Sequence, residues 1–185
     1  MSTNLAAARS RSGWFSRLIG RTRERDRMLP LYRAIVGAAR DPLWYRDGQV
    51  PDTVTGRFDM LSAVTALVLV RMERLDEQAA KRDSVLLTEL FIADMDESLL
   101  ELGVGDYSVG KHVGRMVGAL GGRLTAFREA SNEHDFTPAV HRNIFHATPP
   151  SDDALALVAG RLASFDKALA DQSHADLVDG RLPKP

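Results

Sequence analysis

A chain of 185 residues, 44% of them hydrophobic, is long enough to bury one sizeable core and too short for two comfortable domains. The absence of cysteine excludes a disulfide framework, a thiolate metal site and a cysteine nucleophile. The longest uncharged apolar run, Met60 to Val70, is shorter than the ~20 residues that a helix needs to cross a bilayer, and the net charge of −1 is unevenly distributed.

The first 27 residues form a basic tail that differs from the rest of the chain. Seven arginines against two acids give it a net charge of +5, so the remaining residues carry −6. An apolar helix face flanked by arginines is typical of a helix that lies in a membrane interface. We therefore predict that the basic tail contacts an anionic membrane surface through Trp14, Phe15, Arg17, Leu18, Ile19 and Arg21.

Two other interpretations of the basic tail stay open. It has the composition of a solvated, disordered segment, and up to Arg23 it is rich in arginine and serine and free of acids, as transit peptides are. A secretory signal is not expected, since no sustained apolar segment precedes a small-residue cleavage site. Nucleic acid is not an expected partner, because no basic stripe with interleaved aromatic residues follows the tail.

Residues 28–185 read as one all-α domain, a bundle of about six helices with short loops. Pro30, Thr53 and Ser151 stand where the first turn or the N-cap of a helix is expected. Between the first two helices, a loop over residues 42–52 carries Trp44 and Tyr45, which we expect to fold back onto the core. Apolar periodicity and breaker residues predict helices over about 30–40, 53–77, 83–102, 106–130, 137–146 and 151–171.

The helix over 53–77 is apolar on nearly every side in its middle, so we expect it at the centre of the bundle. Asp83 or Ser84 is the expected N-cap of the third helix, and Gly103 its expected C-cap. Gly121-Gly122 inside the fourth helix costs about 1 kcal/mol per residue relative to alanine. That cost predicts either a close helix crossing or a bend at these two positions.

Sequence signatures of enzymes are missing. The chain has no phosphate-binding glycine-lysine loop, no dinucleotide fingerprint, no Gly-x-Ser-x-Gly and no His-Glu-x-x-His. His141 and His146 are five residues apart and would point to different faces of a helix, which favours solvated histidines over metal ligands. We predict no catalytic residue, no metal and no cofactor.

An acidic cluster near residue 100 is the most suggestive polar feature. At ~100° per residue, Asp94, Glu97 and Glu101 share one helix face, whereas Asp96 points roughly the opposite way. Asp94 and Asp96 therefore cannot share a metal ion on a regular helix. The remaining interpretations are an ordinary solvated face and a surface for a protein partner.

Ordered strings of residues resemble the motifs of one protein family, the ubiquinol-cytochrome c chaperones. Together they span about 100 residues within 28–130, with the basic tail and the residues beyond about 150 outside. Leu100 and Leu120-Gly121 depart from the family pattern, which usually has an arginine and an aromatic-rich pair there. The strings are Leu31-Tyr32-x-Ala34-Ile35-Val36-x-x-Ala39-Arg40, Val50-Pro51-Asp52-Thr53-x-x-Gly56-Arg57-Phe58-Asp59, Asp94-Met95-Asp96-x-Ser98-Leu99 with Glu101-x-Gly103-Val104-Gly105-Asp106-x-x-Val109-x-Lys111, and Gly122-Arg123.

This resemblance implies an α-helical chaperone that supports biogenesis of cytochrome b, and hence of the cytochrome bc1 complex, without a cofactor or a catalytic residue. Its expected partners are cytochrome b or bc1 assembly intermediates. For a bacterial protein, which we favour, it implies a cytoplasmic chaperone peripherally associated with the inner membrane. For an organellar one it implies the mitochondrion.

We expect the partner surface near the third string. Gly103, Gly105 and Asp106 suit a tight corner between helices, and Lys111 would oppose the dipole of the next helix unless an acid, internal or from a partner, offsets its charge. An alternative function is a soluble protein that binds a lipid or quinone between the apolar faces of residues 58–72 and 109–127. The predicted partner-binding residues are Asp94, Asp96, Glu97, Glu101, Gly105, Asp106, Lys111 and Arg123.

Overall fold

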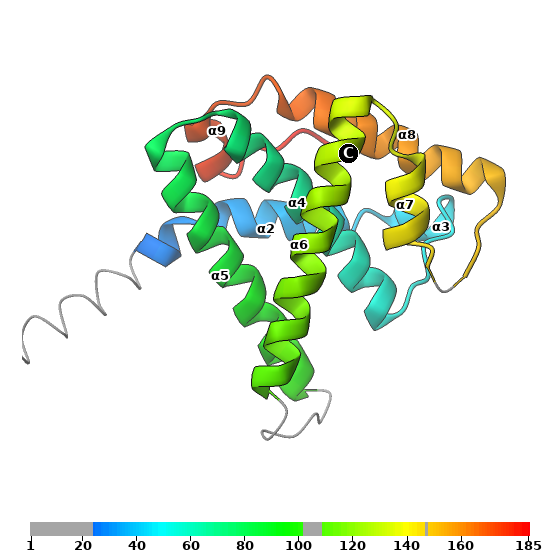
Figure 1. Cartoon of the computed structure of the whole chain (residues 1–185), viewed down its shortest axis with the longest axis horizontal. Coiled ribbons are helices and arrows are strands. Elements are labelled where there is room, and N and C mark those ends of the chain that lie inside the picture. The colour runs from blue at the N-terminus through cyan, green and yellow to red at the C-terminus, as the bar shows by residue number, and fades with distance from the viewer. Residues whose placement is uncertain (1–23, 102–108, 147) are drawn as a thin grey trace, which may run out of the picture.

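The structure is a computed structural model that describes residues 24–101, 109–146 and 148–185, apart from the side chains of 96–101, 109–113, 115 and 116. Every regular element in these ranges is a helix, which confirms the all-α prediction (Figure 1). The elements are α2 (Leu29–Ala39), α3 (Pro42–Arg46), α4 (Val54–Arg74), α5 (Gln78–Glu101), α6 (Val109–Glu133), α7 (Thr137–Asn143), α8 (Asp152–Leu169) and α9 (His174–Val178).

Helix α4 lies at the centre of the bundle, as predicted. The side chain of Thr53 caps it by accepting a hydrogen bond from the backbone N–H of Gly56, and residues 59–70 are all buried. Helices α2, α5, α6 and α8 all pack against it. Met60, Leu67 and Met72 are fully buried, and removing such a side chain from water contributes about 1.5–3 kcal/mol.

Helices α5 and α6 form a pair that projects from the rest of the bundle (Figure 1). In the part of α5 that packs on the bundle, Leu87 and Phe91 are buried. Phe91 packs on Phe58 of α4 with ring centroids 6.0 Å apart. Leu120 and Phe127 are buried in the corresponding part of α6. The apolar faces considered for a lipid or quinone therefore pack against each other where the structure describes them.

The predicted loop over 42–52 contains a short helix, α3. Asp41 caps it by accepting from the N–H of Leu43, and Pro42 stands in its first turn. Trp44 folds back onto the core as expected, fully buried, with its indole N–H donating to the carbonyl of Ala38 at 2.9 Å. The hydroxyl of Tyr45 likewise donates to the carbonyl of Ala39 at 2.8 Å.

Two further predictions, the start of the third helix and the position of the last helix, are wrong. Helix α5 begins at Gln78 rather than near residue 83, and Asp83 is a buried residue inside it instead of a cap. The last helix is followed by α9, which the periodicity did not indicate. Of the two features predicted at Gly121 and Gly122, the close helix crossing is not found, since both residues are exposed and an added Cβ at either would have no contact within 4 Å among the described residues. The alternative of a bend stays a prediction.

None of the helices in the described part of the chain is both long enough and apolar enough to cross a membrane.

Candidate partner-binding surface

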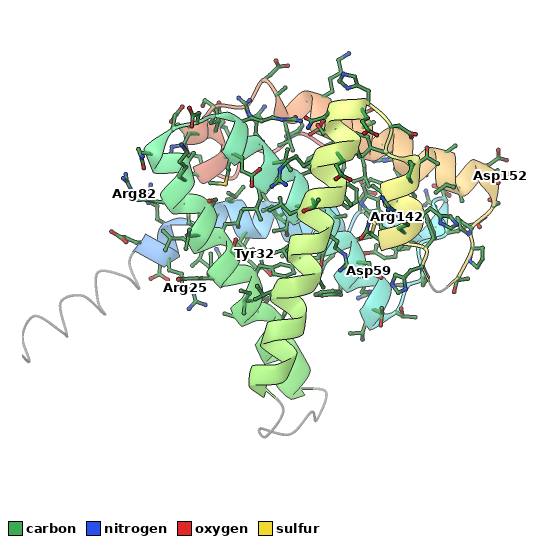
Figure 2. The ribbon with its side chains drawn as sticks, viewed as in Figure 1. Arg25, Tyr32, Asp59, Arg82, Arg142 and Asp152 are labelled. Atoms are coloured by element: carbon green, nitrogen blue, oxygen red, sulfur yellow. The ribbon has the colours of Figure 1, made fainter. Side chains whose placement is uncertain are left out.

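Asp94 is the member of the predicted partner surface whose surroundings are clearest. Its Oδ2 accepts a hydrogen bond from the hydroxyl of Tyr32 on α2 at 2.7 Å. Burial raises the pKa of the Tyr32 phenol, and the Asp94 carboxylate raises it further, so the hydroxyl stays a donor at neutral pH. Figure 2 places Tyr32 where α2 passes α5. The contact joins the first and third family-like strings.

The other predicted residues of that surface cannot be placed by their side chains. Gly105 and Asp106 lie outside the described residues, as do the side chains of Asp96, Glu97, Glu101 and Lys111. The backbone places Glu101 at the end of α5 and Lys111 in the first turn of α6. Glu101 and Lys111 therefore lie at the far end of the projecting α5–α6 pair (Figure 1).

Arg123 does not lie on that surface. Its side chain is only 11% exposed, and its Nη2 donates to Oδ1 of Asp59 on α4. The guanidinium carbon also lies 5.3 Å from the ring centroid of Phe58, a cation–π contact. The Oδ2 of Asp59 is 3.0 Å from Nε2 of His146, which is 43% exposed. We call Asp59, Arg123 and His146 the Asp59 cluster, and Figure 2 shows the position of Asp59 on α4.

The Asp59 cluster holds α4, α6 and the segment after α7 together. Burial raises the pKa of Asp59, and the neighbouring Arg123 and His146 work against that rise. A buried carboxylate needs such partners, because an unpaired charge in the core would cost several kcal/mol. Arg123 is therefore placed to support the position of α6, and a contact of its guanidinium with a partner would require breaking this pair.

Sequence reasoning missed Asp59 and His146 as members of this cluster. Asp59 directly precedes the longest uncharged apolar run of the chain, Met60 to Val70, where a charge requires a partner. The need for a partner, together with the Gly122-Arg123 string, could have indicated that Asp59 pairs with Arg123.

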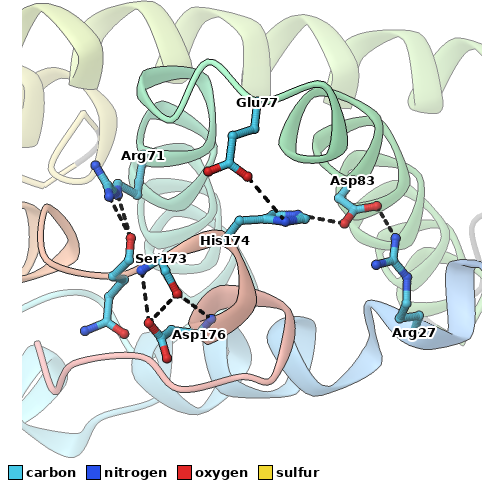
Figure 3. A network of polar contacts seen from close by, with 8 residues as sticks. Arg27, Arg71, Glu77, Asp83, Ser173, His174 and Asp176 are labelled. Atoms are coloured by element: carbon cyan, nitrogen blue, oxygen red, sulfur yellow. Dashed lines mark hydrogen bonds and ion pairs between the residues drawn. The ribbon is translucent and has the colours of Figure 1, made fainter.

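A second buried carboxylate, Asp83 of α5, joins the two ends of the described chain (Figure 3). Its side chain is 1% exposed and accepts from Nη2 of Arg27 at 2.5 Å. Nε2 of His174, at the start of α9, lies 2.8 Å from its other oxygen. Nδ1 of the same imidazole is 3.9 Å from Glu77. We call these four residues the Asp83 network.

The C-terminal segment is fixed at a neighbouring point as well. Arg71 of α4 donates from Nε and Nη2 to the carbonyl of Gln172, at 3.0 and 2.6 Å (Figure 3). Ser173 and Asp176 then form a reciprocal capping box that begins α9. The Asp83 network thus anchors the point where the basic tail meets the bundle, at Arg27.

The predicted membrane-contacting residues lie outside the described part of the chain, since it starts at residue 24. Within the described residues, no group of three histidine or carboxylate side chains could hold a metal ion.

Known proteins give this geometry a context. The family model of the ubiquinol-cytochrome c chaperones matches residues 46–184. The crystal structure of the Cbp3 homolog from Brucella abortus is similar with a TM-score of 0.77 and 30% sequence identity, over 92% of this chain and 96% of that one. No curated protein has a significant sequence match to the chain.

The family match confirms the resemblance inferred from the strings, but its limits differ from those expected. It begins after the first string and continues to residue 184, so the residues beyond 150 lie inside it. Helices α7, α8 and α9 therefore belong to the shared fold. Because the match covers well over half of the sequence, the chain belongs to the ubiquinol-cytochrome c chaperone family, a family of assembly factors and not of enzymes.

Proposed function

We propose that this protein assists assembly of the cytochrome bc1 complex by binding cytochrome b while that subunit is inserted into the membrane. The observation that carries the proposal is the similarity to the Cbp3 homolog over 92% of the chain, together with the family match. The protein acts by binding alone, and its effect is to keep an assembly intermediate from aggregating or being degraded.

The far end of the α5–α6 pair is the proposed contact surface for the client. It carries the acidic face and Lys111, and the pair projects from the bundle (Figure 1). Asp94 supports this surface from the side of the bundle, because its hydrogen bond with Tyr32 holds α5 against α2. Arg123 contributes by fixing α6 to α4 through Asp59.

The basic tail is proposed to bring the chaperone to the membrane. Basic residues near an anionic surface contribute about 1 kcal/mol each, and the apolar residues around Trp14 and Leu18 add burial in the interface. Arg27 supports the proposal from the bundle, because its bond to Asp83 fixes the point from which the tail extends.

A deletion strain of an organism that builds a bc1 complex tests the function. We expect loss of the haem spectrum of cytochrome b with normal cytochrome oxidase, and restoration of the cytochrome b spectrum by the intact gene. Replacing Glu97 and Glu101 by lysine should abolish rescue while leaving the melting temperature unchanged, whereas Asp153→Lys, at an exposed position of α8, should rescue fully. Normal cytochrome b in the deletion strain would overturn the proposal.

A further inference from the structure

A basic pocket opens where the chain turns from α2 through α3 into α4, at the opposite end of α2 from the basic tail. The two ends of α2 are about 16 Å apart, since the helix has 11 residues. The pocket has a volume of about 560 Å³ and is lined by Arg40, Pro42, Tyr45, Arg46, Asp52 and Arg57.

The three arginines of this pocket are available to a ligand. Arg40 is exposed, and its side chain has no ion pair or hydrogen bond with any residue that the structure describes. Arg46 pairs with its neighbour Asp47, and Arg57 pairs with Asp52 at 2.6 Å. Both pairs are solvent-exposed and therefore weak. The carboxylate of a ligand can therefore displace the aspartate of either pair, or bind the same arginine beside it.

Tyr45 gives the pocket a rigid apolar wall. Its hydroxyl is tied to the carbonyl of Ala39, and the ring is half-buried beside Pro42. The ring is therefore held in place before any ligand arrives, which reduces the entropy lost on binding. An apolar side chain can pack on Tyr45 while a neighbouring carboxylate reaches the guanidinium groups.

We propose that the basic pocket binds a short acidic segment of a protein partner, with a carboxylate held by Arg40 and Arg57 and an adjacent apolar side chain on Tyr45. Arginine suits this role, because its planar fork donates two parallel hydrogen bonds to a carboxylate. Asp52 accepts a backbone N–H of the same segment. The inference rests on the proposed function, since it names the kind of segment through which an assembly partner is held.

The acids around the pocket favour a peptide over a lipid surface. Asp47 pairs with Arg46 and Asp52 pairs with Arg57, and a membrane presents many phosphates that these two carboxylates would repel. A peptide offers one carboxylate at a defined position together with hydrogen-bond donors for Asp52. Charge complementarity therefore selects a discrete acidic peptide.

Titration followed by NMR tests this proposal on the intact protein. The probes are the blocked tetrapeptides acetyl-Leu-Glu-Leu-Glu-amide and acetyl-Leu-Gln-Leu-Gln-amide, and the signals are the side-chain Nε–H groups of Arg40, Arg46 and Arg57. We expect saturable shifts with the glutamate peptide and binding about tenfold weaker with the glutamine peptide. Arg40→Gln/Arg57→Gln should weaken binding about tenfold, whereas Arg82→Gln, on the exposed surface of α5, should not.

Three outcomes would overturn the proposal. The first is equal binding of the two peptides. The second is inorganic phosphate that binds as tightly as the glutamate peptide and displaces it, which would show an unselective anion site. The third is a double variant that keeps peptide binding but no longer binds phosphatidylglycerol vesicles, which would place a lipid headgroup there. Peptide binding is measured without the deletion strain, so its failure leaves the test of the proposed function unaffected.

Discussion

Arg123 on α6 donates a hydrogen bond to Asp59 on α4 across 64 residues of sequence, and both side chains are almost entirely removed from water. A buried ion pair of this kind contributes little net stability compared with well-packed apolar residues, but removal of one partner leaves a buried charge. The two helices it joins pack extensively against each other and support the projecting α5–α6 pair.

We expect Arg123→Met to lower the free energy of unfolding by about 3 kcal/mol, because the buried carboxyl group of Asp59 would lose its main partner. Urea denaturation measures this loss. The double variant Asp59→Leu/Arg123→Met should be more stable than Arg123→Met alone, since it removes both charges. A loss below about 1 kcal/mol in the single variant, or a double variant less stable than the single one, would contradict the structural role of the Asp59 cluster.

Asp83→Ala should destabilise the protein by about 2 kcal/mol, because Asp83 accepts from both Arg27 and His174 while nearly fully buried. Glu73→Ala is the matched control, since Glu73 also bridges two helices through Arg128 but is exposed, and it should cost at most about 1 kcal/mol. Hydrogen exchange should show that α9 opens more often in the Asp83 variant. Equal losses in the two variants would show that the Asp83 network has no special role.

Acid should loosen α9 through Asp176. Its hydrogen bonds with Ser173, and then with Arg181, lower its pKa to about 2. Because the folded-state pKa lies below the unfolded value, the charged carboxylate stabilises α9 above about pH 4, and this contribution is lost as the pH falls towards 2.

Carbon-13 chemical shifts of α9 measured between pH 4 and pH 2 test the acid effect. They should move towards coil values in the natural protein, whereas Asp176→Asn should show a weaker α9 already at neutral pH and little further change. A variant with the same acid transition as the natural protein would show that another group causes it.

The basic tail should carry the protein to anionic membranes. We expect the full chain to float with phosphatidylglycerol liposomes at low salt and to dissociate as salt rises, because screening weakens the attraction of its arginines. A chain that starts at Arg27 and the Trp14→Ser/Phe15→Ser variant should float less. Equal flotation of all three, or flotation of none at low salt, would refute the membrane role of the tail.

The long helices could be predicted from the sequence because their signals are local and strong. Helix α4 has apolar residues on nearly all sides and Thr53 as its cap, and Ser151 marks the start of α8 in the same way. Helices α3 and α9 are five residues long, too short to show a helical period, so only their caps, Asp41 and Ser173, could have indicated them.

The polar contacts could not be predicted, because they depend on residues far apart in the chain. Asp83 looks like a helix cap in the sequence, but its role follows from Arg27 and His174, which lie 56 and 91 residues away. The basic pocket likewise forms only when the turn through α3 brings Arg40 close to Arg57. Sequence reasoning directed attention to the acidic third string and overlooked the arginines in the first two.

Co-purification with newly made cytochrome b tests the central claim most directly. The tagged protein is isolated shortly after a pulse of radioactive amino acids, in cells that make both the bc1 complex and cytochrome oxidase. We expect labelled cytochrome b to be recovered early and to leave the chaperone as the mature complex appears, with no labelled oxidase subunit recovered. Recovery of cytochrome b no higher than that of the oxidase subunit would contradict the account.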